Sequence, residues 1–180
     1  FGQLYEPIVW EEQLVLSKLH APFPGASSIG MLYEIDIDVR DTDRSIPFTY
    51  ETHHTITRVR DQTAIDRHNK GYISMYNVDS LVELKVRVIS AEGVVKEMPK
   101  ESFKYIENFE DHGPFMIYAV EGLTPGSEIE VLYKIKTMDL YFGRNYFQFD
   151  YPIQEARFSI VSPATYKLNA KGYNGFETIS

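Results

Sequence analysis

The chain has no cysteine among its 180 residues, which excludes disulfides, thiolate metal sites and a cysteine nucleophile. It also has no apolar run as long as a membrane span. Its N-terminus carries neither the basic region nor the apolar core of a signal peptide, and since it opens on Phe1 we expect a processed or excised piece. The fold therefore depends on noncovalent packing.

Positive charge is sparse, with 18 Lys and Arg residues against 26 Asp and Glu, a net charge of −8 and a pI near 5.1. The basic residues are scattered among acidic neighbours and form no stripe. Nucleic acids and anionic membranes bind to such stripes. We therefore expect no nucleic-acid partner, no membrane partner and no cofactor.

Hydrophobic and aromatic residues are plentiful, at 43% of the chain with 13 tyrosines and 11 phenylalanines. A chain of this length buries roughly 70% of its unfolded surface, and aromatic residues favour strands. We expect an N-terminal arm or linker over residues 1–25, called the arm below, and one β-sandwich domain over residues 26–180.

Two stretches alternate apolar and polar residues and are organised around turns. Residues 82–98 alternate before the turn at 91–93, and residues 117–136 contain the turn at 123–127 followed by a second alternating run. This pattern predicts half-buried strands joined as two hairpins in one antiparallel core. Gly126 lies where the second turn requires a positive φ.

The remaining chain predicts further strands separated by turns rich in Gly, Pro and Asp. Residues 61–70 are tolerant of a helical turn, which Gly71 would close as the residue after the C-cap. The other predicted strands are 29–39, 48–60, 72–77, an edge segment within 103–109, 141–151, 156–161 and 166–170. The first two of these are expected to form a hairpin. About nine or ten strands at this spacing indicate an all-β fold, an antiparallel β-sandwich with a short N-terminal arm or helix.

The arm has two possible conformations. Pro7 suits a first helical position, and Ile8, Trp10 and Leu19 fall roughly on one side of a helix. Residues 14–16 also fit an extended segment whose apolar side chains dock on the sandwich. Both alternatives stay open from the sequence.

Two groups of residues are candidate binding sites. Asp36, Asp38, Asp41 and Asp43 form the densest carboxylate cluster and are candidate calcium ligands, although the spacing lacks the glycine and closing glutamate of an EF-hand loop. The alternative is a solvated hairpin end.

The second group is an aromatic platform for a sugar or peptide, with core packing as its alternative. Its residues are Tyr146, Phe147, Phe149 and Tyr151.

No catalytic residue is expected. His53 and His54 are adjacent on a predicted strand and point to opposite faces, so they cannot act together on one metal ion or substrate. A Gly-x-Ser-x-Gly motif is also missing from the sequence. The chain is therefore expected not to be an enzyme.

Three segments carry a family resemblance: VELKVRVI with the turn AEGVVKEMP, IYAVEGLTPGSEIEVLYKI, and FQFDYPIQEARFSIVSP. From about residue 26 to about 175, the chain resembles a bacterial family of domains of unknown function. That family lies N-terminal to transglutaminase-like domains of papain-like fold in secreted or periplasmic proteins, many of them described as peptidases.

The resemblance implies a non-catalytic accessory module that packs on a neighbouring transglutaminase-like domain of the same polypeptide or presents substrate to it. The cysteine of the catalytic triad belongs to that neighbour, since this chain has none. Peptide and glycan are the possible ligands, and the implied location is periplasmic or secreted. The alternative is a free-standing carbohydrate- or protein-binding adhesion-type sandwich.

Overall fold

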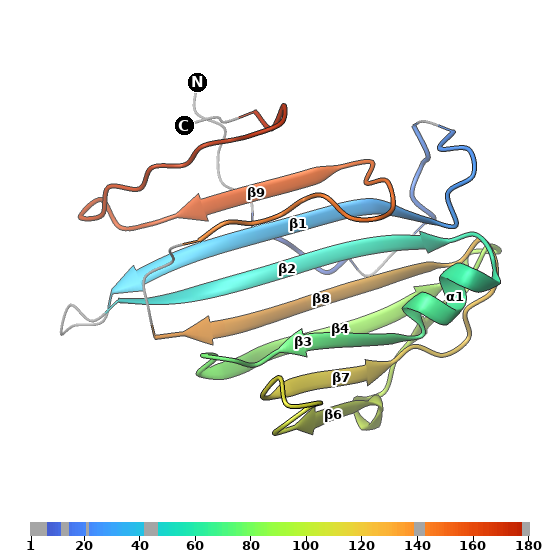
Figure 1. The fold of residues 1–180 in the computed structure, drawn as a ribbon, viewed down its shortest axis with the longest axis horizontal. Helices are drawn as coiled ribbons and strands as arrows, with labels where there is room; N and C mark the ends of the chain where they lie inside the picture. The colour runs from blue at the N-terminus through green and yellow to red at the C-terminus, as the bar shows by residue number, and fades with distance from the viewer. Residues whose placement is uncertain (1–6, 12–14, 21, 42–46, 139–142, 178–180) are drawn as a thin grey trace.

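In a computed structural model of the chain, residues 7–11, 15–20, 22–41, 47–138 and 143–177 are described. They form a sandwich-like all-β fold with two sheets (Figure 1). The strands are β1 (Ser28–Asp41), β2 (Pro47–Val59), β3 (Lys70–Ser74), β4 (Ser80–Ile89), β5 (Val95–Glu97), β6 (Phe103–Ile106), β7 (Phe115–Ala119), β8 (Glu128–Thr137) and β9 (Ala156–Val161). Helix α1 (Gln62–His68) and a 3-10 turn, η1 (Lys100–Ser102), complete the described elements.

The larger sheet has six strands in the order β5-β4-β8-β2-β1-β9. The predicted β1–β2 hairpin is confirmed, and so is the β4–β5 hairpin across the turn after Ile89. One strand departs from the antiparallel expectation, because β9 pairs with β1 in parallel. The reason is topological: β9 returns to the sheet edge after a long connection, so no hairpin fixes its direction.

The smaller sheet has three strands in the order β3-β7-β6, all antiparallel. The second predicted hairpin is therefore wrong. β7 and β8 follow each other in the chain but belong to different sheets, and the turn at 123–127 carries the chain from one sheet to the other. Alternation reports that two strands are half-buried and does not say whether they pair.

Two apolar clusters lie on the same face of the six-stranded sheet, which we call the inner face. One joins Val86, Ile129 and Val131 to residues of the smaller sheet and α1. The other joins Ile35 and Ile37 of β1 to side chains of the C-terminal segment. The smaller sheet thus covers one half of the inner face, and aromatic side chains from the segments before and after β9 cover the other.

Several local predictions in the C-terminal part are wrong. Residues 143–151 and 166–170 form no strand, and aromatic packing on the inner face holds these segments instead. Residues 141 and 142 of the predicted strand lie outside the described residues.

The prediction for Gly71 is also wrong. The residue lies in β3, and α1 has Asn69 as its C-cap. A Cβ on Gly71 would meet Tyr118 Cζ at 1.9 Å, so the glycine makes room for that ring. Gly126 does have the predicted positive φ, at 94°.

The described residues of the arm form neither helix nor strand, which favours the extended alternative over the described positions. Leu14, the first residue of the segment 14–16 in the extended alternative, lies outside them. Among the described residues, no helix has the length and apolar character needed to cross a membrane.

Candidate functional site

The face of the six-stranded sheet opposite the inner face, called the outer face here, buries charged side chains. Because side chains alternate along a strand, β8 points Ile129 and Val131 inward and Glu128 and Glu130 outward. Glu130 is nevertheless only 1% exposed, against 5% for Ile129. Arg87, directly opposite Glu130 on β4, is 2% exposed. The expectation of half-buried strands is therefore wrong for this part of β4 and β8.

Glu130 is the centre of a row of alternating charges. Its two carboxylate oxygens lie 2.7 Å from His54 Nε2 and 2.7 Å from Arg87 Nε. His54 Nδ1 lies 3.7 Å from a Glu34 carboxylate oxygen, and Glu34 lies 3.8 Å from Arg157 Nη1. The row crosses β4, β8, β2, β1 and β9, so each strand contributes one member.

This arrangement shifts the pKa values of its titratable members. Burial lowers the pKa of His54, but hydrogen bonds to Glu130 and Glu34 outweigh it and hold the pKa above the ordinary value of 6.5. Burial raises the pKa of Glu130, but its hydrogen bonds with His54 and Arg87 outweigh that effect and lower it. Both shifts favour the charged pair.

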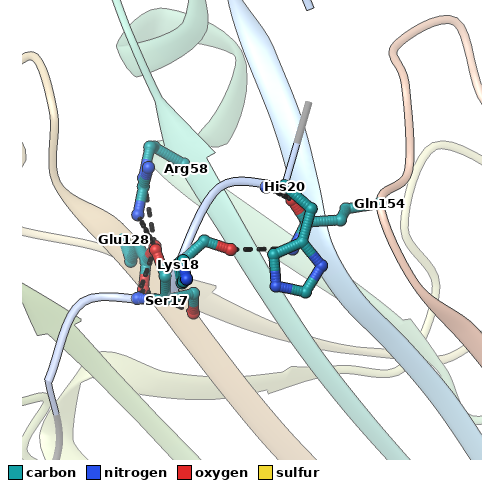
Figure 2. A network of polar contacts seen from close by, with 6 residues as sticks. All are labelled: Ser17, Lys18, His20, Arg58, Glu128 and Gln154. Carbon is teal, nitrogen blue, oxygen red and sulfur yellow. Dashed lines mark hydrogen bonds and ion pairs between the residues drawn. The ribbon is translucent and has the colours of Figure 1, made fainter. Parts of the chain in front are cut away.

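Glu128 and Arg58 form a second charged pair on the outer face, and this pair holds the arm. Arg58 Nη2 lies 2.6 Å from Glu128 Oε1. The main-chain N–H of Ser17 donates to Glu128 at 3.1 Å, and Arg58 Nη2 donates to the Ser17 carbonyl at 2.5 Å. The Ser17 hydroxyl also donates to Glu128, at 3.0 Å. Figure 2 shows the two charged side chains converging on Ser17.

Gln154 holds the next stretch of the arm in the same manner (Figure 2). Its Oε1 accepts from the main-chain N–H of His20 at 2.8 Å, and its Nε2 donates to the Lys18 carbonyl at 3.0 Å. One side-chain amide therefore satisfies two main-chain groups of the arm.

Arg87 holds the beginning of the described arm. Its Nη1 donates to the Glu11 carbonyl at 2.8 Å, and its guanidinium carbon lies 3.8 Å from the ring centre of Trp10. Such a stacked cation contributes about 0.5–2 kcal/mol. Within the described part of the chain, Arg87 Nη2 is the buried side-chain polar atom without a hydrogen-bond partner.

Chemically, this site binds polypeptide main chain. Its side chains accept from two N–H groups of the arm and donate to three carbonyls. With the exceptions of the Ser17 hydroxyl and the Trp10 ring, these contacts do not depend on which side chains the arm carries.

A second candidate is a cavity of about 330 Å³ against the inner face. Five tyrosines line it, namely Tyr33, Tyr72, Tyr118, Tyr133 and Tyr151, beside two histidines, two threonines and a lysine. Burial raises the pKa of Tyr118 to about 12 and also raises that of Tyr133, so both phenols stay protonated at neutral pH. The cavity offers hydroxyl groups and aromatic faces to a small ligand.

A serine, Ser28, lies beside His68, which is one of the residues that line this cavity. Ser28 Oγ is 3.0 Å from His68 Nε2, a distance that suits a nucleophile and its base. Ser28 is only 2% exposed, however, and burial followed by the charge of Arg67 lowers the pKa of His68. The side chain of Ser28 is therefore largely shielded from solvent, which favours a structural role for this contact.

The predicted aromatic platform is divided by the structure. Phe147 packs with Tyr33 and Phe158 in the second apolar cluster, while Tyr146 is 71% exposed. Phe149 stacks on Tyr151, with ring centres 5.5 Å apart, and Tyr151 lines the tyrosine cavity. Ligand binding by Tyr146, Phe147, Phe149 and Tyr151 stays a prediction.

The predicted calcium ligands have partners of other kinds. Asp36 is buried and accepts from Ser159 Oγ at 2.7 Å, Asp38 pairs with Arg40 at 2.6 Å, and Asp41 accepts from the Tyr166 hydroxyl. Asp43 lies outside the described residues. The described residues contain no group of three or more acidic, His or Cys side chains placed to hold a metal ion. The four-carboxylate site stays a prediction.

Sequence reasoning did not find the residues that hold the arm. Arg87, Glu128 and Glu130 sit at positions that alternation assigns to solvent, and Gln154 lies in a loop. The available signal was the pairing of opposite charges: Arg58 faces Glu128 and Arg87 faces Glu130 across neighbouring strands. That signal requires the register of strands distant in sequence, which the sequence alone does not give.

The sequence comparison shows the family. Residues 49–180 match the family described as a domain of unknown function with a solved structure, DUF3857. The match covers most of the chain, from β2 to the C-terminus, so the chain belongs to this family of domains. Among curated proteins, none matches the chain.

Solved structures show the same fold. One is a crystal structure from Parabacteroides distasonis described as a "putative protease", with a TM-score of 0.54 and 12% sequence identity. The alignment covers 64% of this chain and 24% of that one, so the chain spans about a quarter of its structural neighbour. At this identity the likeness concerns the fold alone.

Proposed function

We propose that this domain is a non-catalytic accessory module of a longer polypeptide, packing on a transglutaminase-like catalytic domain of papain-like fold or presenting substrate to it. The proposal follows the family resemblance of three segments, and it agrees with a structural neighbour in which the matched part is 24% of the chain. It places the domain in the periplasm or outside the cell, as the resemblance implies.

The observation that carries this proposal is the chemistry of the outer face. Its buried charges contact main-chain groups of the arm, which is binding chemistry. In the described part of the chain, the serine that touches a histidine is only 2% exposed, and the sequence has no cysteine. Binding is therefore supported by more of the geometry than catalysis is.

The test is a binding assay between this domain and the remainder of its own polypeptide, with the activity of that remainder recorded with and without the domain. We expect saturable binding and a changed rate on peptide substrates. An absence of both effects would contradict the accessory role and favour an independent binding domain.

A second candidate function, glycan binding by a free-standing sandwich, is favoured by the exposed ring of Tyr146 and the partly exposed Phe149 near the tyrosine cavity. Exposed aromatic faces stack on sugar rings. A titration with soluble oligosaccharides tests it, and Tyr146→Ala is expected to weaken any glycan binding that uses this platform.

A further inference from the structure

We propose that the outer face holds a binding site for an extended peptide, that the arm fills this site within its own chain, and that a peptide segment of a substrate or partner takes the place of the arm. This inference deepens the proposed function, because it names extended polypeptide as the class of ligand that the accessory module receives. It rests on that function only in treating the domain as a binding module.

The first argument is the Gln154 contact with the arm. A side-chain amide that accepts from the N–H of His20 and donates to the carbonyl of Lys18 takes the place of the N–H and C=O of one residue on a neighbouring parallel strand. It requires the extended conformation in which these two groups point the same way, and it uses no side-chain atom of either residue. Any extended segment offers the same pair of groups.

The second argument is the charged pair that holds Ser17. The carboxylate of Glu128 accepts from the N–H of Ser17, and the guanidinium of Arg58 donates to the carbonyl of the same residue. Hydrogen bonds to charged groups are roughly twice as strong as neutral ones. Glu128 is paired with Arg58 across neighbouring strands, so the two charged groups do not depend on the peptide to bring them together.

The third argument is the upstream anchor. Arg87 donates to the Glu11 carbonyl and lies under the Trp10 ring, and its Nη2 has no hydrogen-bond partner within the described residues. The preferred ligand is thus an extended peptide with an aromatic side chain upstream of the segment held by Glu128, Arg58 and Gln154.

Exchange is physically reasonable because the covered surface is polar. If the arm leaves, Glu128, Arg58 and Arg87 become hydrated, so no charge stays buried without a partner. The tethered arm competes at an effective concentration in the millimolar range. A free peptide is therefore expected to bind well only after the arm has been weakened.

The test uses the 180-residue chain and its single tryptophan. Trp10→Phe removes that fluorophore and weakens the upstream anchor. Trp10→Phe combined with Ser17→Pro also removes the N–H and the hydroxyl that donate to Glu128. A synthetic peptide with the sequence of residues 7–20 then carries the tryptophan in the mixture, so its emission and anisotropy report binding directly.

We expect saturable binding by both variants, tighter for the double variant. Two changes should reduce it at least about tenfold, the loss of about 1.4 kcal/mol: Gln154→Ala in the protein, or N-methylation of the peptide at Ser17 and His20. The matched controls are Gln148→Ala, an exposed glutamine in the segment that covers the inner face, and N-methylation at Lys18, which contributes its carbonyl.

No saturable binding by Trp10→Phe up to about 1 mM peptide would overturn the proposal even if the double variant does not fold. Equal binding of the methylated and unmethylated peptides would also overturn it. Concentration-dependent dimers held by reciprocal arms would overturn it in favour of arm exchange between copies. This titration contains no catalytic domain, so a failure of peptide binding is distinguishable from a failure of the accessory role.

Discussion

The two faces of the six-stranded sheet are buried by different means, although neighbouring residues of the same strands form them. The inner face is covered by a second sheet, a helix and aromatic side chains, and its core is aliphatic. The outer face is covered over Glu128 and Arg87 by an arm without helix or strand in its described residues, and it buries charges in cross-strand pairs.

The difference shows that burial has separate physical consequences on each face. Apolar burial on the inner face stabilises the fold by about 25 cal/mol per Å² removed from water. Charges on the outer face gain little net free energy from burial, because desolvation offsets their attraction. Apolar packing on the inner face therefore supplies more of the net folding free energy, whereas the outer face is the one that we propose binds peptide when uncovered.

The largest expected effect comes from breaking the charged row at its centre. Glu130→Ala leaves Arg87 and His54 buried without their shared carboxylate, and we expect it to lower the free energy of unfolding by about 3–5 kcal/mol. Urea denaturation measures this. Ile129→Ala, its inward neighbour, should cost about 2–5 kcal/mol through loss of apolar packing.

The matched control for Glu130→Ala is Glu121→Ala, which removes one partner of an exposed ion pair 3.3 Å long with Lys96. We expect a change within about 0.5 kcal/mol. Equal costs at Glu121 and Glu130 would contradict the claim that burial makes the outer-face carboxylate important.

The next largest loss of stability is expected at the turn that precedes β8. Gly126 has φ 94°, and a Cβ there would lie 3.1 Å from the Ala91 Cβ. We expect Gly126→Val to lower stability by about 1–3 kcal/mol from backbone strain, and more if Ala91 cannot move. Gly93→Val, with φ 83° and open space around its Cβ, is the control for strain without contact. An unchanged melting temperature in Gly126→Val would contradict this account of the turn.

A smaller effect is the pH dependence of stability, which is expected to differ between a histidine on the outer face and one beside the inner cavity. The pKa of His54, on the outer face, lies above 6.5, so its stabilisation is present below pH 6.5 and is lost as pH rises through the folded pKa. The pKa of His68, beside the inner cavity, lies below 6.5, so unfolding takes up a proton and stability falls as pH drops below 6.5.

NMR titration of the two imidazoles checks this directly, with His54 titrating above His68. His54→Gln should remove the decline in stability above pH 6.5, and His68→Gln should remove the decline that His68 causes below it. Identical titration midpoints would contradict the contrast between the two environments.

The smallest effect is expected at the exposed contact with the arm. Gln154→Ala removes two hydrogen bonds to main-chain atoms of the arm, and we expect a global cost of about 1 kcal/mol or less, because the arm can detach while the sheet stays folded. Proteolysis after Lys18 should become faster in this variant. A large loss of global stability would show that the arm is part of the cooperative core.

Periodicity predicted much of the fold, for a clear reason. Strands β1, β2, β4 and β8 alternate over many residues, and short turns fixed the β1–β2 and β4–β5 hairpins. It failed where aromatic packing replaced pairing, as at Phe147, and where one sheet led to another after Ala119. The arm site depends on Glu128 meeting Ser17 across 111 positions, which no local pattern encodes.

The most direct measurement is amide hydrogen exchange in the unmodified chain, comparing Ser17 and His20 in the arm with Ile129 and Val131 in β8. We predict that the arm amides are protected but exchange through a local opening that requires less free energy than global unfolding, whereas the β8 amides exchange only on global unfolding. Equal opening free energies for the arm and β8 would contradict the claim that the arm is a separately removable cover of the outer face.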